Sequence, residues 1–277
     1  MRYAGPHMAV FLCWVMKMRI IRPRLLAHEN VPGFPKELLQ EHLGDVYGLR
    51  TLCIRSEDHG FELMNRTRHY SILWLLGDVV LLAEPARLLD VLLAAFQRRR
   101  VARTEPADAI LADTPELVAE ISARCIMRGI SVSDAFQFSQ GTQFAFHLLL
   151  SPAECEHLNG YESAWLERFG ERCSYSRSAF FCWGDNPKMR CTWSAVPGQI
   201  PTARCSSGLF WIPHVGRWYT KRELLAAFGY PCYAQLAEAA GVPDYEHAPS
   251  SVDVGNCMNV ASVGIALLVA MACTRLK

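Results

Sequence analysis

The sequence predicts a mixed α/β fold that is interrupted by a long insert. In the first third of the chain, β-prone apolar runs alternate with a helix-forming segment, as in an α/β sheet covered on both faces. From about residue 111 to residue 210 this alternation is lost, and irregularly spaced aromatic residues and turn formers replace it. Hydrophobic residues make up 51% of the 277, which is ample material for a core.

The first third of the chain supplies the predicted sheet. The first apolar run has hydrophobic side chains on every side, as in a buried helix, and the strand after it runs into the turn former Pro32-Gly33. Pro35 begins the next helix, where its missing N–H costs nothing. The expected elements are a helix, a strand, a helix and two strands, over residues 8–20, 24–27, 35–43, 51–54 and 69–76.

The remaining predicted helices flank the insert. An amphipathic helix over residues 85–96 ends in Gln97-Arg98-Arg99-Arg100, and cations suit the negative end of a helix dipole. This position explains the three arginines, although contact with phosphate is the alternative. Three further helices are expected late in the chain, over residues 221–228, 233–240 and 259–273.

Charge and hydropathy limit the partners. Lys plus Arg is 28 and Asp plus Glu is 27, a net charge of +1, so a nucleic-acid contact must be concentrated on one face. The run over 260–273 is shorter than the ~20 residues that cross a bilayer. Residues 8–14 are followed, not preceded, by their positive charges, unlike a signal peptide. We therefore expect no membrane partner, and a tail anchor over 260–273 is the minor alternative.

The eleven cysteines predict reduced thiols. Their number is odd and no C-x-x-C pair occurs, which favours mostly buried thiols of an intracellular protein over a secreted disulfide framework. Cys182, Cys191, Cys205 and His214 can be drawn as a zinc site, but the paired ligands of a zinc knuckle are missing. The sequence therefore predicts no metal.

Short segments that carry chemistry occur in a defined order. Glu29-Asn30-Val31 follows a strand, Arg66-Thr67-Arg68 precedes one, and Gly255-Asn256 opens the last helix. Thr220-Lys221-Arg222-Glu223-Leu224-Leu225 and Gly229-Tyr230-Pro231 lie between the second and third segments. In this order and spacing they resemble the C-terminal two thirds of DNA (cytosine-5) methyltransferases, across nearly all of the chain.

The resemblance implies an incomplete Rossmann-like sheet of an S-adenosylmethionine methyltransferase with a small, loop-rich target-recognition insert. Residues 1–84 would be part of the catalytic domain, residues 85–215 the insert, and residues 216–277 helices that return to the catalytic domain. The implied partner is DNA, in the nucleus of a eukaryote or otherwise in the cytoplasm. A tRNA-directed relative shares the same landmarks, so RNA stays open as a substrate.

The family's chemistry assigns roles to the matching residues. Cytosine C5 is a poor nucleophile, so a cysteine attacks C6 while a carboxyl group at N3 stabilises the ring; by resemblance this group is Glu29, with Asn30 holding the loop. Arg66 and Arg68 match an arginine pair of which one contacts the flipped base or the covalent intermediate. Gly255-Asn256 and the next two residues would contact the methyl donor, which assigns Asn256, Cys257 and Met258 to cofactor binding.

Simpler interpretations exist for the same residues. Glu29 before a Pro-Gly turn is then a solvated turn residue, and Arg66 and Arg68 are surface arginines beside Glu57, Asp58 or Glu62. Gly255-Asn256 is then an ordinary helix start that attracts anions. The corresponding alternative function is a non-catalytic DNA-binding or partner subunit that keeps the methyltransferase fold.

The sequence departs from the family in its catalytic loops. The glycine-rich cofactor loop and the Pro-Cys nucleophile loop are not found, and the chain begins about one helix before Glu29. We therefore expect a fragment, a subunit completed by a second polypeptide, or a decayed paralogue, and no turnover from the chain alone. Pro231-Cys232 is expected to be a packing element, because no base or helix start lies near its thiol. Met64 and Phe228 stand where the family has Gln.

Overall fold

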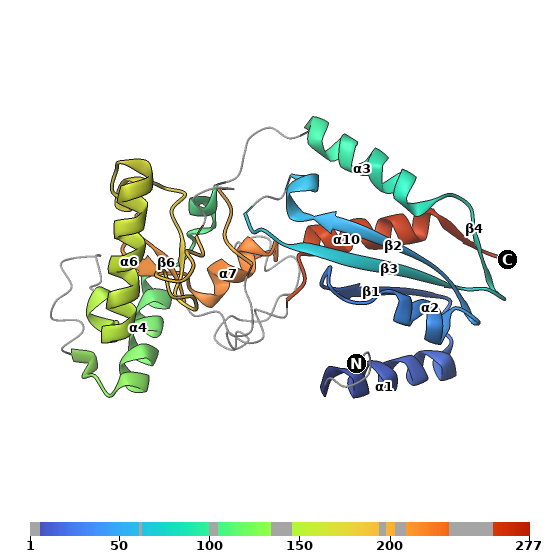
Figure 1. Ribbon diagram of the computed structural model, residues 1–277, viewed down its shortest axis with the longest axis horizontal. Coiled ribbons are helices and arrows are strands. Elements are labelled where there is room, and N and C mark those ends of the chain that lie inside the picture. Colours follow the sequence, from blue (N-terminus) through green and yellow to red (C-terminus); the bar gives the residue numbers. More distant parts are fainter. Residues whose placement is uncertain are drawn as a thin grey trace. The chain divides into compact units, whose positions relative to one another are not determined.

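The structure is a computed structural model that describes residues 6–60, 63–99, 105–133, 146–193, 198–202, 209–232 and 257–277. It is mixed α/β, as expected from the sequence (Figure 1). Its sheets are small and antiparallel, which the sequence did not predict. Internal contacts divide the chain into two compact units. Unit 1 comprises residues 1–60, 67–101 and 261–277, and unit 2 comprises residues 61–66 and 102–260.

The centre of unit 1 is a three-stranded sheet with the order β1-β3-β2. The middle strand is antiparallel to both neighbours, so β1 and β2 run in the same direction, and α2 (Glu37–Leu43) connects them. The predicted strands are confirmed, although β2 begins four residues earlier than expected. The strands β1, β2 and β3 span Leu25–Asn30, Tyr47–Arg55 and Thr67–Leu75.

Helices cover both faces of this sheet (Figure 1). Alternate side chains of a strand point to opposite faces. Leu73 and Leu75 therefore pack with α1 and α2, whereas Ile72 packs with α3 and α10. The prediction of a sheet covered on both faces is confirmed. The three helices not yet bounded, α1, α3 and α10, span Pro6–Ile21, Pro85–Arg99 and Val260–Ala272.

The end of the chain is fastened to unit 1 by a second small sheet. Strand β4 (Val79–Leu81) pairs antiparallel with β8 (Thr274–Leu276).

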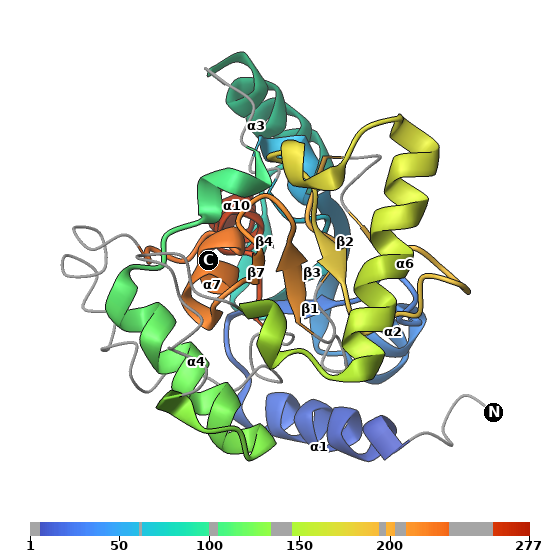
Figure 2. The ribbon, with the colours of Figure 1, turned by 90° about the vertical axis from the view of Figure 1, so that its left-hand side faces the viewer.

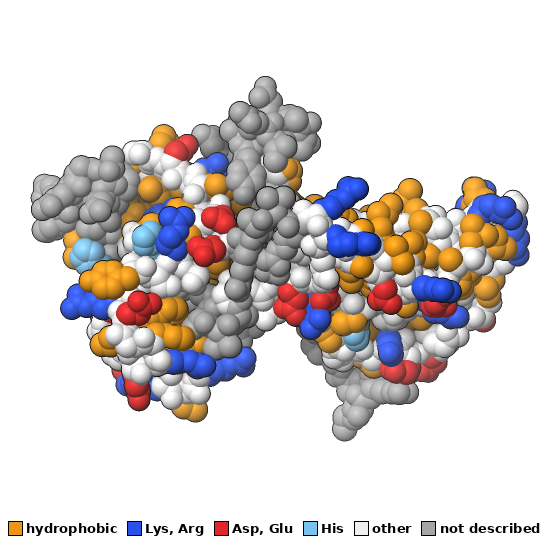
Figure 3. Space-filling view, turned by 90° about the horizontal axis from the view of Figure 1, so that it is seen from above, with side chains coloured by type: hydrophobic (Ala, Val, Ile, Leu, Met, Phe, Trp, Pro, Cys, Tyr) orange, Lys and Arg blue, Asp and Glu red, His pale blue; other side chains and the backbone are white. Residues whose placement is uncertain are grey.

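Figure 3 shows hydrophobic side chains interspersed with Lys and Arg on the surface of unit 1, at the right of the view. In the part of the chain that the structure describes, no helix is both long and apolar enough to cross a membrane.

The described residues of unit 2 include a small sheet and the helices α4, α6 and α7 (Figure 2). The sheet has the order β5-β6-β7 and is antiparallel. Three short 3-10 helices, η2, η3 and η4, span Pro106–Ala109, Phe146–Leu149 and Cys173–Tyr175. The strands span Phe181–Cys182, Phe210–Ile212 and Arg217–Trp218, and the helices α4, α6 and α7 span Thr114–Arg128, Pro152–Phe169 and Lys221–Ala227.

The expectation of a loop-rich insert needs correction, because α4 and α6 are two of the longer helices. Both begin at a side chain that caps free backbone N–H groups: Asp113 accepts from Glu116 N, and Ser151 forms a capping box with Glu154. Gly129 ends α4 with a positive φ of 63°, which favours glycine. The helix expected over 221–228 is confirmed as α7, and the one over 233–240 lies outside the described residues.

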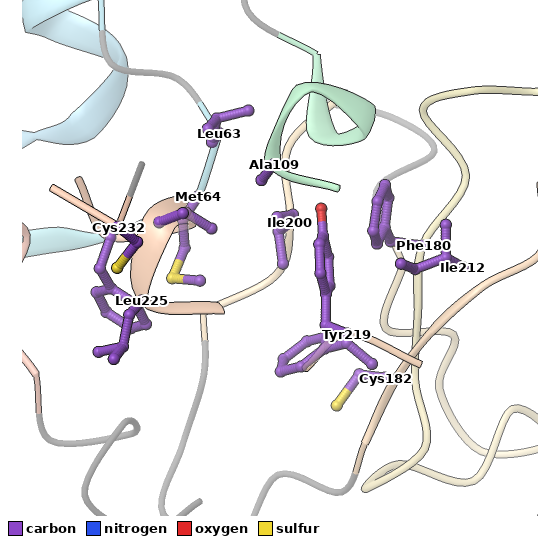
Figure 4. Close-up of a cluster of buried hydrophobic side chains, with 14 residues drawn as sticks. Leu63, Met64, Ala109, Phe180, Cys182, Ile200, Ile212, Tyr219, Leu225 and Cys232 are labelled. Carbon is purple, nitrogen blue, oxygen red and sulfur yellow. The ribbon is translucent and has the colours of Figure 1, made fainter. Parts of the chain in front are cut away.

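The irregularly spaced aromatic residues of the insert form the cores of unit 2. One core gathers Phe180, Ile212 and Tyr219 around α7 (Figure 4). A second contains Tyr161, which stacks on Phe181 with ring centroids 4.9 Å apart, together with four tryptophans. The aromatic spacing therefore reflects packing between small elements rather than one periodic face.

The two units divide the chain differently from the boundaries expected at residues 84 and 215. The helix α3 belongs to unit 1 because Leu89 packs with Ile72 and Val269. The helix α7 belongs to unit 2 because Leu225 packs in the same core as Phe180.

Candidate functional site

Three of the predicted site residues, Glu29, Asn30 and Arg68, lie at one end of the unit 1 sheet. There β1 and β2 end and β3 begins, as their antiparallel pairing requires. Glu29 lies opposite Tyr70 and Arg68 lies opposite Ile54. Strand alternation places Glu29 and Arg68 on the same face as Tyr70, which is the face covered by α3 and α10.

Glu29 and Arg68 form a partly buried ion pair. Arg68 Nε lies 2.9 Å from Glu29 Oε1, and the side chains are 13% and 16% exposed, respectively. Arg68 also donates to the carbonyl of Thr67 at 2.8 Å, which fixes the guanidinium at the start of β3. The carboxyl group is therefore held beside a guanidinium group that is itself fixed at the start of β3.

Asn30 shapes the turn that follows. Its Oδ1 accepts a hydrogen bond from the backbone N–H of Val31 at 2.9 Å, the local turn chemistry typical of asparagine. The side chain thereby stabilises the direction in which the chain leaves β1, directly after Glu29.

A buried polar pair that the sequence analysis missed lies on the same face. His59 ends η1 (Ser56–His59) after β2, and its Nε2 lies 2.9 Å from Ser262 Oγ in the first turn of α10. The two residues are 7% and 1% exposed. Burial lowers the pKa of His59 to about 4, against the opposing charge of Asp58, so the imidazole is neutral at pH 7. In the sequence, His59 before Gly60 signals only the end of a strand.

Arg66 belongs to unit 2, because the boundary between the units falls between Arg66 and Thr67. The side chain is buried, and its guanidinium carbon lies 5.0 Å from the ring centroid of Phe228. This is a cation–π contact. Phe228 thus provides an aromatic face for the arginine.

The segment before α10 reaches the same place in unit 2. The N–H of Val260 donates to the carbonyl of Phe228 at 3.0 Å, and Cys257 packs against the core that contains Phe228. Burial raises the pKa of Tyr230, and the neighbouring Cys257 raises it further. Met258 is exposed, and Asn256 lies outside the described residues.

The structure therefore sorts the predicted site residues into two groups. Glu29, Asn30 and Arg68 gather in unit 1, and Arg66 and Cys257 gather around Phe228 in unit 2. Of the residues predicted to bind the cofactor, the two that the structure describes, Cys257 and Met258, offer a thiol and a thioether. These two groups do not by themselves hold the charged S-adenosylmethionine.

Residues 220–225, which contributed to the family resemblance and lie at the start of α7, have a structural role. Glu223 is fully buried, and its carboxylate accepts two hydrogen bonds from Arg217 at 2.7 Å. It also accepts the backbone N–H groups of Leu111 and Ala112 at 2.8 Å. Glu223 therefore joins α7 to the segment before α4, and its neighbour Arg222 binds Glu116 at 2.7 Å in support.

The cysteines that the structure describes form neither a disulfide nor a metal centre. Those that the structure describes are all free thiols, and Cys205 lies outside that set. Within the described residues, no group of three His, Cys, Asp or Glu side chains is placed to hold a metal ion. Cys232 is buried in the core of unit 2, where it packs with Met64 and Leu225.

Unit 1 is a three-layer α/β body with an acid, an arginine and a neutral imidazole on one face of its sheet. No protein-family model matches the sequence, and no protein with a curated description matches it.

Proposed function

We propose that this chain is a DNA (cytosine-5) methyltransferase-like protein, of the class that transfers a methyl group from S-adenosylmethionine to C5 of cytosine. The observation that supports this most directly is the ion pair between Glu29 and Arg68 at the carboxyl end of β1. Two segments chosen from sequence order alone supply these residues, and the fold joins them.

The pair suits the task of stabilising an attacked cytosine. When a thiolate adds to C6, negative charge develops on the ring and N3 takes up a proton or a strong hydrogen bond. Glu29 is proposed to make that contact. Arg68 is proposed to position the carboxyl group and to neutralise the charge left on it, which a planar guanidinium does better than an ammonium.

The proposal includes inactivity of these 277 residues on their own. No glycine-rich cofactor loop and no Pro-Cys loop before Glu29 occur in this sequence, and Cys232 is buried among apolar side chains. Turnover is proposed to need both loops, carried by a longer form of this chain or by a second polypeptide, with DNA as the substrate and the nucleus as the location in a eukaryote.

The inactivity is tested by incubating the purified chain with DNA and tritiated S-adenosylmethionine. We expect no incorporation above background. Incorporation that survives Cys232→Ser but is lost in Glu29→Gln would overturn the inactivity and would keep the role of Glu29. Incorporation into tRNA instead of DNA would correct the substrate.

A non-catalytic DNA-binding or partner subunit is the second candidate. It is favoured by the burial of Arg66 against Phe228 and by the mutual neutralisation of Glu29 and Arg68, because such contacts also stabilise a fold. This candidate predicts DNA binding with a steep salt dependence and little sequence preference. It further predicts that Glu29→Gln leaves DNA affinity unchanged.

A further inference from the structure

The sheet of unit 1 has two strand edges at which backbone groups can meet another chain. Its outer strands, β1 and β2, each pair only with β3. Because helices cover both faces of the sheet, the edges are the parts that are left for pairing. The two edges differ in how well they are protected.

The register of β1 against β3 determines which of its backbone groups point outward. The N–H of Leu75 donates to the carbonyl of Arg24 at 2.9 Å, so these residues form a hydrogen-bonded pair of the antiparallel ladder. Such pairs alternate along a ladder, so Leu25, Ala27 and Glu29 direct their N–H and C=O groups away from β3. Within the described part of the chain, these outward groups have no hydrogen-bond partner. Ala27, at the centre of the three, is exposed.

The opposite edge, on β2, is protected. The N–H of Leu76 donates to the carbonyl of Val46, so the same alternation makes Leu49 an outward-facing residue. Its carbonyl is already occupied, because Arg50 Nη1 donates to it at 2.9 Å. Arg50 and Arg55 are both exposed on this strand. Charged side chains of this kind keep a strand edge from pairing.

The edge of β1 has no comparable protection. Its six residues include no Lys or Arg, and its one carboxylate, on Glu29, is paired with Arg68. Burial lowers the pKa of His28, so this imidazole is neutral at pH 7. Another strand of the same character therefore meets no unpaired charge on β1.

The strand is complementary to itself. An antiparallel pairing of two β1 strands centred on Ala27 places Leu25 of each copy opposite Glu29 of the other, so every outward-facing residue of the strand is matched. Leu26 then lies opposite His28, and no like charges face each other. A pairing centred elsewhere leaves outward groups of the strand unmatched.

Helix α1 supplies apolar surface for such an association. The rings of Trp14 on α1 and His28 on β1 lie 4.9 Å apart, so the helix lies beside this strand. Val10, Met16 and Ile20 of the same helix are 70%, 63% and 78% exposed. A two-fold axis perpendicular to the sheet places the α1 helices of both copies on one face. Strand pairing alone is marginal, and apolar burial between the copies is what a stable dimer requires in addition.

We propose that two copies of this chain form a dimer in which their β1 strands pair antiparallel about Ala27. The two unit 1 sheets then become one sheet, with the protected β2 strands at its two ends. This goes beyond the proposed function and does not depend on it, because the pairing uses the backbone of β1 and not the Glu29 carboxylate.

Ala27→Pro tests the strand pairing directly. Proline removes the outward N–H at this position and leaves the hydrogen bonds to β3 intact, because a strand tolerates proline where its N–H faces away from the neighbouring strand. Sedimentation velocity is measured over a wide range of protein concentration. We expect the wild-type chain to form a species of twice its mass of 31.1 kDa. Ala27→Pro should raise the dissociation constant of this dimer at least about 100-fold, through the loss of pairing hydrogen bonds.

Ala27→Lys keeps the test valid if the proline variant fails to fold. It retains the backbone N–H and changes only an exposed side chain, but it sets two ammonium groups opposite each other at the two-fold axis. Lysine is the residue with which natural edge strands avoid pairing. We expect Ala27→Lys to be monomeric and to keep the circular dichroism spectrum of the wild-type chain.

The matched control is Cys53→Pro on the outer edge of β2. Cys53 is exposed, and alternation from Val46 places its N–H outward as well. This variant should dimerise like the wild-type chain. Glu29→Gln leaves the backbone of β1 unchanged and should also dimerise, so the dimer and the proposed role of Glu29 stand or fall separately.

Other results would overturn the proposal. A wild-type chain that is monomeric at every concentration lacks the interface. A dimer that persists in both Ala27→Pro and Ala27→Lys does not use the β1 edge, and one that is then lost in Ile20→Asp is formed by α1 alone. A dimer lost in Cys53→Pro but kept in Ala27→Pro uses the β2 edge instead.

Discussion

Arg217 and Glu223 form an ion pair inside the core of unit 2, with both guanidinium Nη atoms 2.7 Å from a carboxylate oxygen. The two side chains are 6% and 0% exposed. Because Glu223 also accepts backbone N–H groups from the segment before α4, this pair connects parts of unit 2 that are more than 100 residues apart in the chain. Removing one member leaves the other charge buried and unpaired.

Glu223→Gln should therefore strongly destabilise unit 2. We expect a loss of about 3 kcal/mol in the free energy of unfolding, as is typical when one member of a buried ion pair is removed. Chemical denaturation followed by tryptophan fluorescence measures this, since five of the seven tryptophans lie in unit 2. The control is Glu156→Gln. Glu156 forms an exposed ion pair with Lys188, so this substitution should leave the free energy of unfolding unchanged. A Glu223→Gln variant as stable as the control would show that the pair is not a structural anchor.

The pair of Glu29 and Arg68 should be energetically coupled. A double-mutant cycle with Glu29→Gln and Arg68→Met should give a coupling of about 1–2 kcal/mol in the unfolding of unit 1, because both side chains are largely buried. The same cycle on Arg50 and Glu84, which are about half exposed, should give a smaller coupling. Equal couplings in the two cycles would mean that Glu29 is solvated as an ordinary turn residue.

Acid should destabilise unit 1 through His59. Its pKa of about 4 in the folded state lies below its ordinary value of 6.5, so the unfolded chain binds a proton first as the pH falls. The stability from neutral His59 is complete above pH 6.5 and is lost toward pH 4, at up to about 1.4 kcal/mol per pH unit. His28, whose pKa burial also lowers, acts in the same direction.

The variant His59→Gln isolates this contribution. Its unfolding free energy should depend less steeply on pH between 6.5 and 4 than that of the wild-type chain, while His28→Gln tests the second histidine separately. An identical pH profile for His59→Gln and the wild-type chain would exclude a buried neutral imidazole at this position.

Alanine substitutions at two glycines of unit 1 should have opposite effects on stability. A Cβ at Gly48 in β2 would lie 2.2 Å from the Trp74 ring, so Gly48→Ala should destabilise by about 1–3 kcal/mol through overpacking. A Cβ at Gly264 in α10 meets nothing within 4 Å, so Gly264→Ala should stabilise by about 0.5–1 kcal/mol through helix propensity. Thermal unfolding of both variants checks the register of β2 against β3 and the exposure of that side of α10. Destabilisation by Gly264→Ala would place another group against the helix.

The sheet of unit 1 was predictable because its signals are local. The nearly continuous apolar run in residues 69–76 marks a strand with two buried faces, and the turn after Glu29 marks a strand end. Once the end of β1 and the start of β3 are antiparallel neighbours, Glu29 and Arg68 must meet. The positions of Glu29 and Arg68 in the sequence therefore sufficed to predict that their side chains lie close together.

Unit 2 was less predictable for two physical reasons. Its strands have only two or three residues, too few to show alternation, and its aromatic residues pack between elements rather than along one face. The helices α4 and α6 were nevertheless signalled by Asp113 and by the capping box of Ser151 and Glu154. The bridge between Met64 and Ile200 joins residues that are more than 130 positions apart, and no local pattern reports such a contact.

The central claim is that Glu29 acts on the cytosine ring. The most direct measurement is tritiated methyl transfer to DNA by the chain mixed with a second polypeptide that carries a glycine-rich cofactor loop and a Pro-Cys loop, in a complex shown to form. We expect transfer in the wild-type mixture and in the Glu84→Gln control, and a loss of at least about 100-fold in Glu29→Gln, the usual effect of removing a general acid. No transfer by the assembled wild-type complex, or equal rates in all three, would contradict the account.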